Sequence, residues 1–242
     1  MNEFIESFAF EKSNSECDQQ KQERIQNEEF THISKKAKYD ENIVYDINTE
    51  NLKPPFVLVF DTETSSLNGS VIQLAWILAD CCGNIVDTYC EYWKLPKNPT
   101  NFEKIDPRAQ EIHGITEEVL SEKGLDPTIE VDKFIRMCRI ALMNGCIIVA
   151  HNANFDVARI NHTAVKHNIS KKLDAHDMFC TMKNSTARCG LLKINGRTKA
   201  PTNSELHFKL VGKLPTENLH DALEDCRVTL KSYIQGCIQG WW

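Results

Sequence analysis

The sequence predicts an α/β domain built on a mixed sheet, and three observations support this prediction. Three apolar segments of strand character follow one another between residues 56 and 93. Beyond them, segments of helical and of strand character alternate. This order is typical of an α/β domain that combines parallel and antiparallel strands. With 242 residues, 41% of them hydrophobic, the chain is long enough to bury the core of such a domain.

A change in composition predicts that this domain spans residues 53–242. Residues 1–52 contain twelve acidic and six basic residues and show no sustained apolar pattern. Such a segment buries too little apolar surface to offset the entropy of ordering, so we expect a disordered tail. Pro54 and Pro55 mark the boundary. Residues 53–242 hold 22 acids and 22 bases, so the net charge of −6 lies entirely in the tail.

The first three strands include a predicted hairpin. Residues 56–60 ("FVLVF") form the first strand, and "VIQLAWILAD" from Val71 forms the second. The turn "CCGN" leads into the third strand, "IVDTYCEYW". Two apolar runs joined by a short turn predict antiparallel pairing.

Helices and strands are expected to alternate after residue 127. "EVDKFIRMCRIALM" predicts a helix that ends at Asn144-Gly145. "CIIVA" is a short buried strand, and a helix follows near Phe155, with Asn152 or Asn154 available as its N-cap. The core face of the first helix consists of Val131, Phe134, Ile135, Cys138, Ala141 and Leu142, and that of the last helix of Ala222, Cys226, Thr229, Leu230 and Tyr233.

The sequence predicts a soluble, intracellular protein. Its longest apolar run, from Val71, is too short to span a bilayer. The first ten residues carry Glu3 and Glu6 and no basic residue, unlike a secretion signal. Ten cysteines without a C-x-x-C pair indicate reduced thiols. We therefore expect a cytoplasmic or nuclear protein that is neither secreted nor attached to a membrane.

Two short features of the tail, and one at the C-terminus, are candidates for binding a partner. "KKAK" from Lys35 resembles a minimal nuclear-import patch. Trp241 and Trp242 serve either as a docking point or as ordinary packing of the C-terminus. An apolar island in the tail, suited to a docking peptide, consists of Phe4, Ile5, Phe8 and Phe10.

Two carboxylates, Asp61 and Glu63, follow the first strand. Residues i and i+2 of a strand point to the same face, so these side chains project together if the strand continues through Glu63. Two neighbouring anions repel each other unless a cation lies between them. Oxygen ligands favour a hard ion such as Mg²⁺ or Mn²⁺. The alternative is a solvated strand end.

Two further acidic segments lie at the starts of predicted helices. In "HNANFD", Asp156 falls in the first helical turn, where it either complements the helix dipole or faces a cleft at the end of a strand. In "HDALED", Asp221 and Asp225 share a helical face. The residues alone do not choose between Asp221, Glu224 and Asp225 as a ligand, nor between a catalytic and a structural His220.

Together, "FDTET", "HNANFD" and "HDALED" resemble the three exonuclease motifs of the DEDDh, or DnaQ-like, family. That family includes the epsilon proofreading subunit of bacterial DNA polymerase and RNase T. The resemblance covers roughly residues 55–236, and "IHGIT" from Ile112 matches a linking segment. The H-x-x-x-x-D spacing of the family favours Asp225 as the partner of His220. The resemblance implies an RNase H-like fold with a five-stranded mixed sheet flanked by helices.

The resemblance also implies a mechanism. Asp61, Glu63, Asp156 and Asp225 would hold two Mg²⁺ or Mn²⁺ ions, with Asp61 between them. His220 would act as the general base. The implied reaction is hydrolysis of the last phosphodiester at a 3′ end, which releases nucleoside 5′-monophosphates.

The expected substrate is the 3′ end of single-stranded DNA, in a proofreading or repair role. Residues 183–213 carry seven basic residues and one acid, which indicates a surface for nucleic acid or merely a solvated basic loop. Leu67 lies where family members place an apolar residue against the terminal base, whereas Phe155 could also belong to the core. Candidate substrate-binding residues are Thr62, Thr64, Leu67, His113, Asn152, Phe155, Lys193 and Arg197.

The sequence departs from the family pattern at two points and leaves alternatives open. Ser66 stands where the first motif commonly has glycine, and "KAPTN" lacks the aromatic residue common in that segment. An exoribonuclease would use the same fold and metals. A catalytically inactive scaffold of the same fold is the alternative from another class. Any proofreading for a DNA polymerase would be in trans, with the tail or the terminal tryptophans as docking points.

Overall fold

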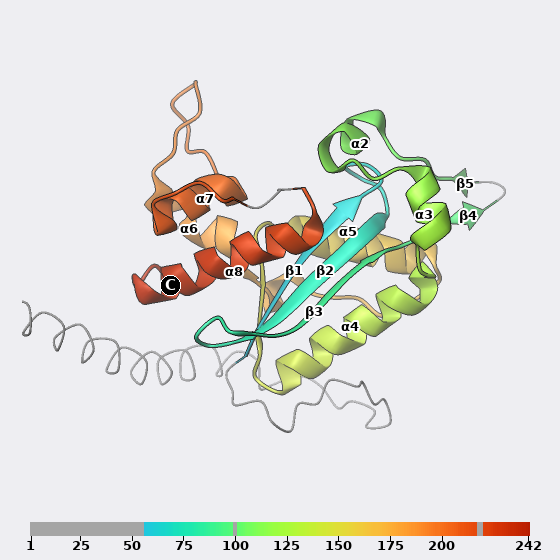
Figure 1. Ribbon diagram of the computed structural model, residues 1–242, viewed down its shortest axis with the longest axis horizontal. Helices are drawn as coiled ribbons and strands as arrows, with labels where there is room; N and C mark the ends of the chain where they lie inside the picture. Colours follow the sequence, from blue (N-terminus) through green and yellow to red (C-terminus); the bar gives the residue numbers. More distant parts are fainter. Residues whose placement is uncertain (1–55, 99–100, 217–219) are drawn as a thin grey trace, which may run out of the picture.

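The computed structural model describes residues 56–98, 101–216 and 220–242 (Figure 1). The predicted tail, with its apolar island and its "KKAK" segment, lies outside the described residues. The predicted fold class is confirmed: five strands form one mixed sheet in the order β3-β2-β1-β6-β7, with helices on both faces. No described helix has the length and apolar composition that a bilayer span requires.

The predicted hairpin forms half of the sheet. Strands β1 (Phe56–Thr64), β2 (Val71–Asp80) and β3 (Ile85–Tyr92) pair antiparallel in sequence. The turn between β2 and β3 closes through Gly83, whose positive φ of 85° suits a glycine. Strands β6 (Ile147–Ala150) and β7 (Phe179–Cys180) continue the sheet in parallel to β1. Two short strands, β4 (Lys97–Asn98) and β5 (Asn101–Phe102), form a separate ladder.

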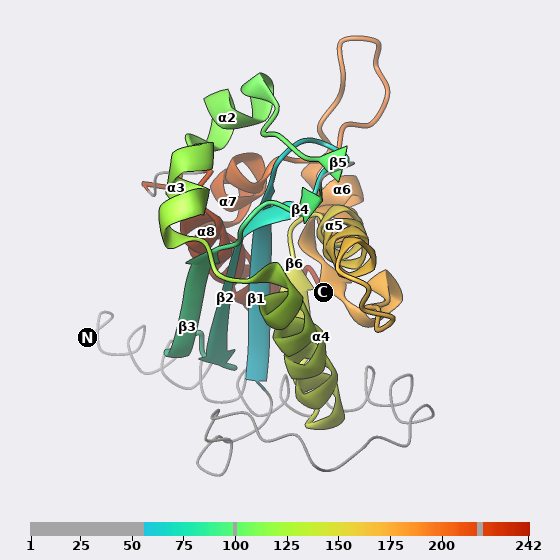
Figure 2. The ribbon, with the colours of Figure 1, turned by 90° about the vertical axis from the view of Figure 1, so that its right-hand side faces the viewer.

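Alternation along β1 divides the core between the two faces of the sheet. Val57 and Val59 belong to the cluster under α8 (Ala222–Ile238). Leu58 and Phe60 belong to the cluster under α4 (Pro127–Met143) and α5 (Ala153–Lys166). The Phe60 ring lies 5.2 Å from that of Phe134 on α4. Figure 2 shows α8 and the pair α4 and α5 on opposite sides of the strands.

Short helices that the sequence pattern did not predict complete the domain. Helices α2 (Pro107–His113) and α3 (Glu117–Lys123) connect β5 to α4. A 3₁₀ turn (Ala175–Asp177) precedes β7, and α6 (Thr181–Cys189) follows it. Helix α7 (Asn203–Val211) begins at a capping box formed by Thr202 and Glu205 and packs against α8. These helices are too short for a periodic apolar pattern to identify them.

Packing explains the terminal Trp242. Its ring stacks on Tyr233 at 6.0 Å and meets the edge of Phe179 at 5.3 Å. Its indole N–H donates to the carbonyl of Tyr233 at 3.2 Å. Gly236 on α8 leaves the space for this ring, because a Cβ there would overlap Trp242. Of the two alternatives, a docking point or ordinary packing of the C-terminus, packing therefore describes Trp242, because its ring lies against other side chains of the domain.

Candidate active site

Strand β1 carries Asp61 and Glu63 to the carboxyl end of the sheet. The strand stays extended through Thr64, and Glu63 pairs opposite Gln73 on β2. The two carboxylates therefore share the face that Val57 and Val59 occupy, which is the face covered by α8. The register shifts between Glu63 and Thr64, and Thr64 pairs with Val71 before the chain enters the loop of residues 65–70.

The structure gives three different roles to the three acids at the start of α8. Asp221 is the N-cap, and one of its oxygens accepts the backbone N–H groups of residues 223 and 224. Its other oxygen accepts the side-chain amide of Gln73 at 3.1 Å. Glu224 forms an ion pair with Arg227 at 3.4 Å. Asp225 is the acid whose carboxylate lies next to Glu63.

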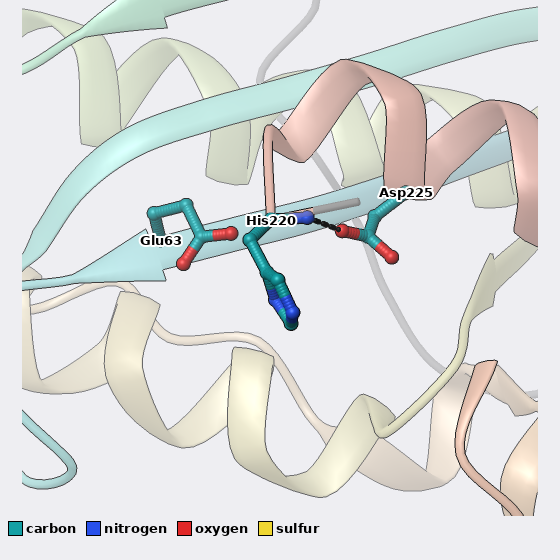
Figure 3. Close-up of side chains that lie close together, drawn as sticks. All are labelled: Glu63, His220 and Asp225. Atoms are coloured by element: carbon teal, nitrogen blue, oxygen red, sulfur yellow. Dashed lines mark hydrogen bonds between the residues drawn. The ribbon is translucent and has the colours of Figure 1, made fainter. Parts of the chain in front are cut away.

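Glu63, His220 and Asp225 form a compact cluster (Figure 3). Each offers one possible ligand atom, and these atoms lie within 4.8 Å of one another. The backbone N–H of His220 donates to one oxygen of Asp225 at 2.7 Å. The other oxygen of Asp225 accepts the side-chain amide of Asn203 at 3.0 Å. Asp225 is thus oriented by hydrogen bonds on both of its oxygens.

Asp156 reaches the same end of the sheet from the opposite face. It lies in the first turn of α5, and it is only 3% exposed. The hydroxyl of Thr62 donates to its carboxylate at 2.8 Å. Because even-numbered residues of β1 face α5, Thr62 connects the strand to the helix there. Elements on both faces of the sheet therefore contribute carboxylates to one end of β1.

Burial and mutual repulsion shift the protonation of these carboxylates. Desolvation, followed by the charges of Asp156 and Asp225, raises the pKa of Asp61 well above its usual range. Desolvation and the charge of Asp225 raise the pKa of Glu63 to about 8. Desolvation raises the pKa of Asp156 to about 7, although the hydrogen bond from Thr62 opposes the shift. When these carboxylates are deprotonated, their negative charges are therefore poorly balanced by their surroundings.

The donor set fits a divalent cation. Four acidic neighbours raise the pKa of Asp61, and three raise that of Glu63. A cation among the carboxylates would remove the repulsion that raises their pKa values. Carboxylate oxygens with at most one imidazole nitrogen match the preference of Mg²⁺ or Mn²⁺.

The predicted substrate-binding residues differ in their surroundings. Leu67 is 76% exposed in the loop that follows β1. Phe155 is partly exposed, with the guanidinium of Arg159 6.0 Å from its ring centre, so it does not belong to the buried core. Thr64 is buried, and its hydroxyl donates to the carbonyl of Ser66 at 2.9 Å. Asn152 is the N-cap of α5, but its side chain makes no capping hydrogen bond.

His113 has an unused hydrogen-bonding atom. Its Nδ1 accepts the backbone N–H of Ile115 at 3.0 Å. Its Nε2 is buried and has no hydrogen-bond partner among the described residues. Burial lowers the pKa of His113; an interaction with the backbone of Thr64 opposes this shift, and the charge of the neighbouring His220 adds to it, so the ring favours the neutral form. A buried polar atom without a partner is unusual and is suited to a ligand.

Lys193 and Arg197 lie apart from the carboxylate cluster. They are exposed residues of the segment between α6 and α7. The backbone N–H of Lys193 donates to the carbonyl of Arg197 at 2.8 Å, so both belong to one tight hairpin. The hairpin follows α6 and precedes α7, whose first residue, Asn203, contacts Asp225.

Sequence reasoning missed Glu103, which holds the loop of residues 65–70. Its carboxylate accepts hydrogen bonds from the hydroxyl of Ser65, from the backbone N–H of Ser70 at 2.6 Å, and from the hydroxyl of Ser70 at 2.8 Å. Although burial opposes it, these hydrogen bonds hold the pKa of Glu103 below its usual value. Glu103 thereby fixes the loop that exposes Leu67.

The two departures from the family pattern cause no local strain. Ser66 does not need the conformational freedom of glycine, because the non-glycine residues with positive φ in the described chain are Asn168 and His220. In the "KAPTN" segment, the carbonyl of Pro201 lies 3.1 Å from Nε2 of the buried His151. The segment is therefore tied to the end of β6 even without an aromatic residue.

Comparison with protein families gives one match over most of the chain. A family model described as "Exonuclease" (RNase_T) matches residues 58–233. This range contains all five residues that the three motifs predicted for the site: Asp61, Glu63, Asp156, His220 and Asp225.

Curated relatives match over a shorter range. The chain is 32% identical over 130 residues to a "DNA polymerase III PolC-type" of Streptococcus thermophilus. It is 34% identical over 133 residues to the protein of the same name from Streptococcus pyogenes serotype M18. These matches cover 52% and 53% of this chain but 8% of each relative. The chain thus spans a small part of the length of the relatives it matches.

Solved structures share the fold. An Escherichia coli exonuclease I in complex with a dA16 oligonucleotide aligns with a TM-score of 0.57 and 17% identity, over 76% of this chain and 41% of that one. An exonuclease X in complex with 5′ overhanging duplex DNA aligns with a TM-score of 0.50 and 24% identity, over 77% of this chain and 94% of that one. At these identities, the likeness concerns the arrangement of the sheet and its helices.

Proposed function

Because the chain belongs to the exonuclease family, we propose that it is a 3′–5′ exonuclease that depends on divalent metal ions. It hydrolyses the last phosphodiester of a nucleic acid strand and releases nucleoside 5′-monophosphates. We propose single-stranded DNA 3′ ends as its preferred substrate. Two ions, Mg²⁺ or Mn²⁺, would occupy the carboxylate cluster.

One observation carries this proposal. Glu63, His220 and Asp225 offer atoms within 4.8 Å of one another, near the half-buried Asp61 and the buried Asp156. The acidic neighbours that raise the pKa of Asp61 and of Glu63 support a site for cations over a structural ion-pair network. The five side chains also argue against an inactive scaffold, which would not need them.

The residues divide the chemistry between them. Asp61, Glu63, Asp156 and Asp225 would hold the ions, and Asn203 would keep the carboxylate of Asp225 in position. The bound ions would stabilise the negative charge that develops on the phosphodiester. His220 would accept the proton of the attacking water. Its exposed position beside the cluster leaves the ring free to approach that water.

The substrate would be held on both sides of the cluster. Leu67 would pack against the terminal base, because it presents an exposed apolar side chain next to Glu63. His113 would donate or accept through the unpartnered Nε2. The basic residues between α6 and α7 would contact phosphates farther along the strand. Asn152 and Phe155, at the start of α5, complete the proposed contacts.

A polymerase is the proposed protein partner. The relatives from Streptococcus are named as DNA polymerases, and this chain matches 8% of their length. Association with a polymerase would bring the proposed exonuclease site to mismatched 3′ ends. We propose that it does so inside the cell, in the cytoplasm or the nucleus.

The test is an assay of end-labelled oligonucleotides. Purified protein should shorten 5′-labelled single-stranded DNA from its 3′ end with Mg²⁺ or Mn²⁺, and EDTA should stop the reaction. Asp61→Asn should abolish hydrolysis, because the variant lacks the charge proposed to lie between the ions. RNA of the same sequence, assayed in parallel, distinguishes a deoxyribonuclease from an exoribonuclease.

The outcomes of this assay separate the alternatives. Faster hydrolysis of RNA than of DNA would favour an exoribonuclease. Release of internal fragments, or shortening from the 5′ end, would contradict the proposed polarity. If Asp61→Asn retained Mg²⁺-dependent hydrolysis, Asp61 would not have its proposed role. Binding of DNA without hydrolysis would favour a scaffold.

A further inference from the structure

A hairpin arm, residues 190–201, projects between α6 and α7. It closes through backbone hydrogen bonds between residues 193 and 197 at 2.8 Å and between residues 191 and 199 at 2.8 Å. The turn at its tip contains Asn195 and Gly196, and the positive φ of 76° at Gly196 suits a glycine. Figures 1 and 2 both show the arm extending away from the domain at the end of the sheet where β1 ends and α2 lies.

The arm exposes apolar side chains at its tip. Ile194 is fully exposed, and Leu192 is 65% exposed. Neither belongs to any of the core clusters of the described residues. Two exposed aliphatic side chains on a projecting turn are available for contact with a partner.

Basic residues surround this apolar tip. The arm contains Lys193, Arg197 and Lys199 and no acidic residue. Lys199 forms an ion pair with Glu205 at the start of α7, at 2.5 Å. No carboxylate pairs with Lys193 or Arg197 within the described part of the chain. The tip therefore combines uncompensated positive charge with exposed aliphatic surface.

The arm is fixed to the active site at its base. The carbonyl of Pro201 lies 3.1 Å from Nε2 of His151, which immediately precedes α5. Two residues later, Asn203 donates to the carboxylate of Asp225 at 3.0 Å. The base of the arm is therefore connected by hydrogen bonds to the segments that carry Asp156 and Asp225.

We propose that the arm engages the duplex of a nucleic acid whose 3′ end enters the active site, and that Ile194 enters the base stack and helps to separate the strands. This inference rests on the proposed exonuclease function. Lys193 and Arg197 would lie against phosphates, whose charge complements theirs. Proteins that open base steps insert apolar wedges, Ile and Leu among them, whereas surfaces for single strands stack bases on aromatic rings. The arm exposes two large aliphatic residues, Leu192 and Ile194, and contains no aromatic one, so its composition favours a duplex.

Strand opening can be measured without hydrolysis. A blunt DNA duplex with 2-aminopurine near one 3′ end is titrated with the protein in EDTA, and its fluorescence rises when that base leaves the stack. The wild-type protein should raise the fluorescence, and Ile194→Ser should remove most of the increase. Ile129→Ser is the matched control, because Ile129 is 54% exposed on α4, which covers the other face of the sheet.

Hydrolysis provides the second measurement. The ratio of kcat/KM on the blunt duplex to kcat/KM on the single strand should fall about tenfold in Ile194→Ser, because opening a base step costs a few kcal/mol that the wedge would otherwise offset. The ratio should stay the same in Ile129→Ser. Arg197→Glu should weaken duplex binding and flatten its dependence on salt. Lys172→Glu is the control, because Lys172 is an exposed residue in the segment that follows α5, and this variant should bind the duplex like the wild type.

Each result decides the proposal. An unchanged fluorescence increase in Ile194→Ser, or an equal loss on duplex and single strand, would overturn a role in strand opening. A wild-type protein that neither binds the duplex nor raises its fluorescence would do the same. If the protein hydrolyses neither substrate, the proposed exonuclease function fails, and the fluorescence titration still decides the role of the arm.

Discussion

The backbone of His220 explains how one residue serves both the fold and the proposed chemistry. Its φ of 76° lies in the left-handed region, which costs a non-glycine residue about 1–2 kcal/mol. This conformation directs its backbone N–H to the carboxylate of Asp225 at 2.7 Å. A hydrogen bond to a charged group contributes about 1.5–3 kcal/mol, enough to offset that cost. The imidazole is left exposed beside Glu63.

Replacement of His220 should therefore be tested with asparagine. Asparagine tolerates the left-handed region and lacks the basicity of imidazole, so His220→Asn isolates the proton transfer from the backbone. We expect kcat to fall by about 10²–10⁴-fold, with Mg²⁺ affinity preserved. Single-turnover kinetics and a metal titration measure the two quantities. Turnover within a fewfold of wild type would show that another group accepts the proton.

At the scale of elements, the sequence pattern predicts the strands and helices that are long enough to show an apolar period. Strand β1 with Asp61 and Glu63, the hairpin of β2 and β3, and helices α4 and α8 follow from their apolar periodicity. Short α2, α3, α6 and α7 do not, because seven to nine residues give too few turns. Their caps, such as Thr202 with Glu205, were the available signal.

The site likewise contains residues that the sequence predicts and residues that only the structure identifies. Motif spacing brought Asp61, Glu63 and Asp225 into consideration, and the structure supplies what spacing cannot. Gln73 interrupts an apolar strand, and its contact with Asp221 depends on β2 meeting the start of α8. Asn203 contacts Asp225 across 22 positions of sequence. Contacts of this kind depend on the packing of separate elements and leave no local pattern.

Helix α7 should influence metal binding through Asn203. The side chain of Asn203 donates to the carboxylate of Asp225 at 3.0 Å and to its backbone carbonyl at 3.2 Å. Asn203→Ala should weaken Mg²⁺ binding by about 10–100-fold, the range seen when a ligand loses its supporting hydrogen bond. Isothermal titration in parallel with thermal melting measures this effect.

A matched control is Asn144→Ala at the end of α4. Its amide donates to the carbonyl of Ile140, at 3.1 Å, within its own helix. This variant should keep wild-type Mg²⁺ affinity. If both variants lost affinity equally, a general loss of stability would explain the result, and the role assigned to Asn203 would be wrong.

At the scale of the whole molecule, the cluster of carboxylates opposes the folding of the metal-free protein. Burial raises the pKa of Glu63 from 4.5 to about 8 and that of Asp156 from 3.8 to about 7. A carboxyl group whose pKa is higher in the folded state favours folding while it is protonated. That contribution is complete below the unfolded pKa and disappears as the pH rises through the folded pKa.

The metal-free protein should therefore lose stability as the pH rises from the unfolded pKa values, 4.5 for Glu63 and 3.8 for Asp156, to the folded values of about 8 and about 7. The part of this window from pH 7 to 8 lies above the range in which histidines ordinarily titrate. In EDTA, the melting temperature should fall across the window by about 2–4 °C for each kcal/mol of lost stability. Mg²⁺ should stabilise the protein most at the alkaline end, because deprotonated carboxylates bind it.

Two observations check the sign of this effect. Glu63→Gln removes one of the charges, so its melting temperature in EDTA should depend less on pH than that of the wild type. A wild-type melting temperature that stays constant or rises from pH 7 to 8 in EDTA would contradict the repulsion described here. Thermal melting by circular dichroism is sufficient for both comparisons.

The position of α8 has a consequence for the newly made chain. Asp61 and Glu63 lie on the first strand of the sheet, but His220 and Asp225 come with the last helix that packs on it. During synthesis, a domain generally folds as a unit, and α8 is the last of the described elements to emerge. A nascent or prematurely terminated chain that ends before His220 therefore carries three of the four proposed ligands, Asp61, Glu63 and Asp156, and no general base. If the proposed function holds, the order of the elements would leave unfinished copies of the protein without the general base that hydrolysis of nearby nucleic acids requires.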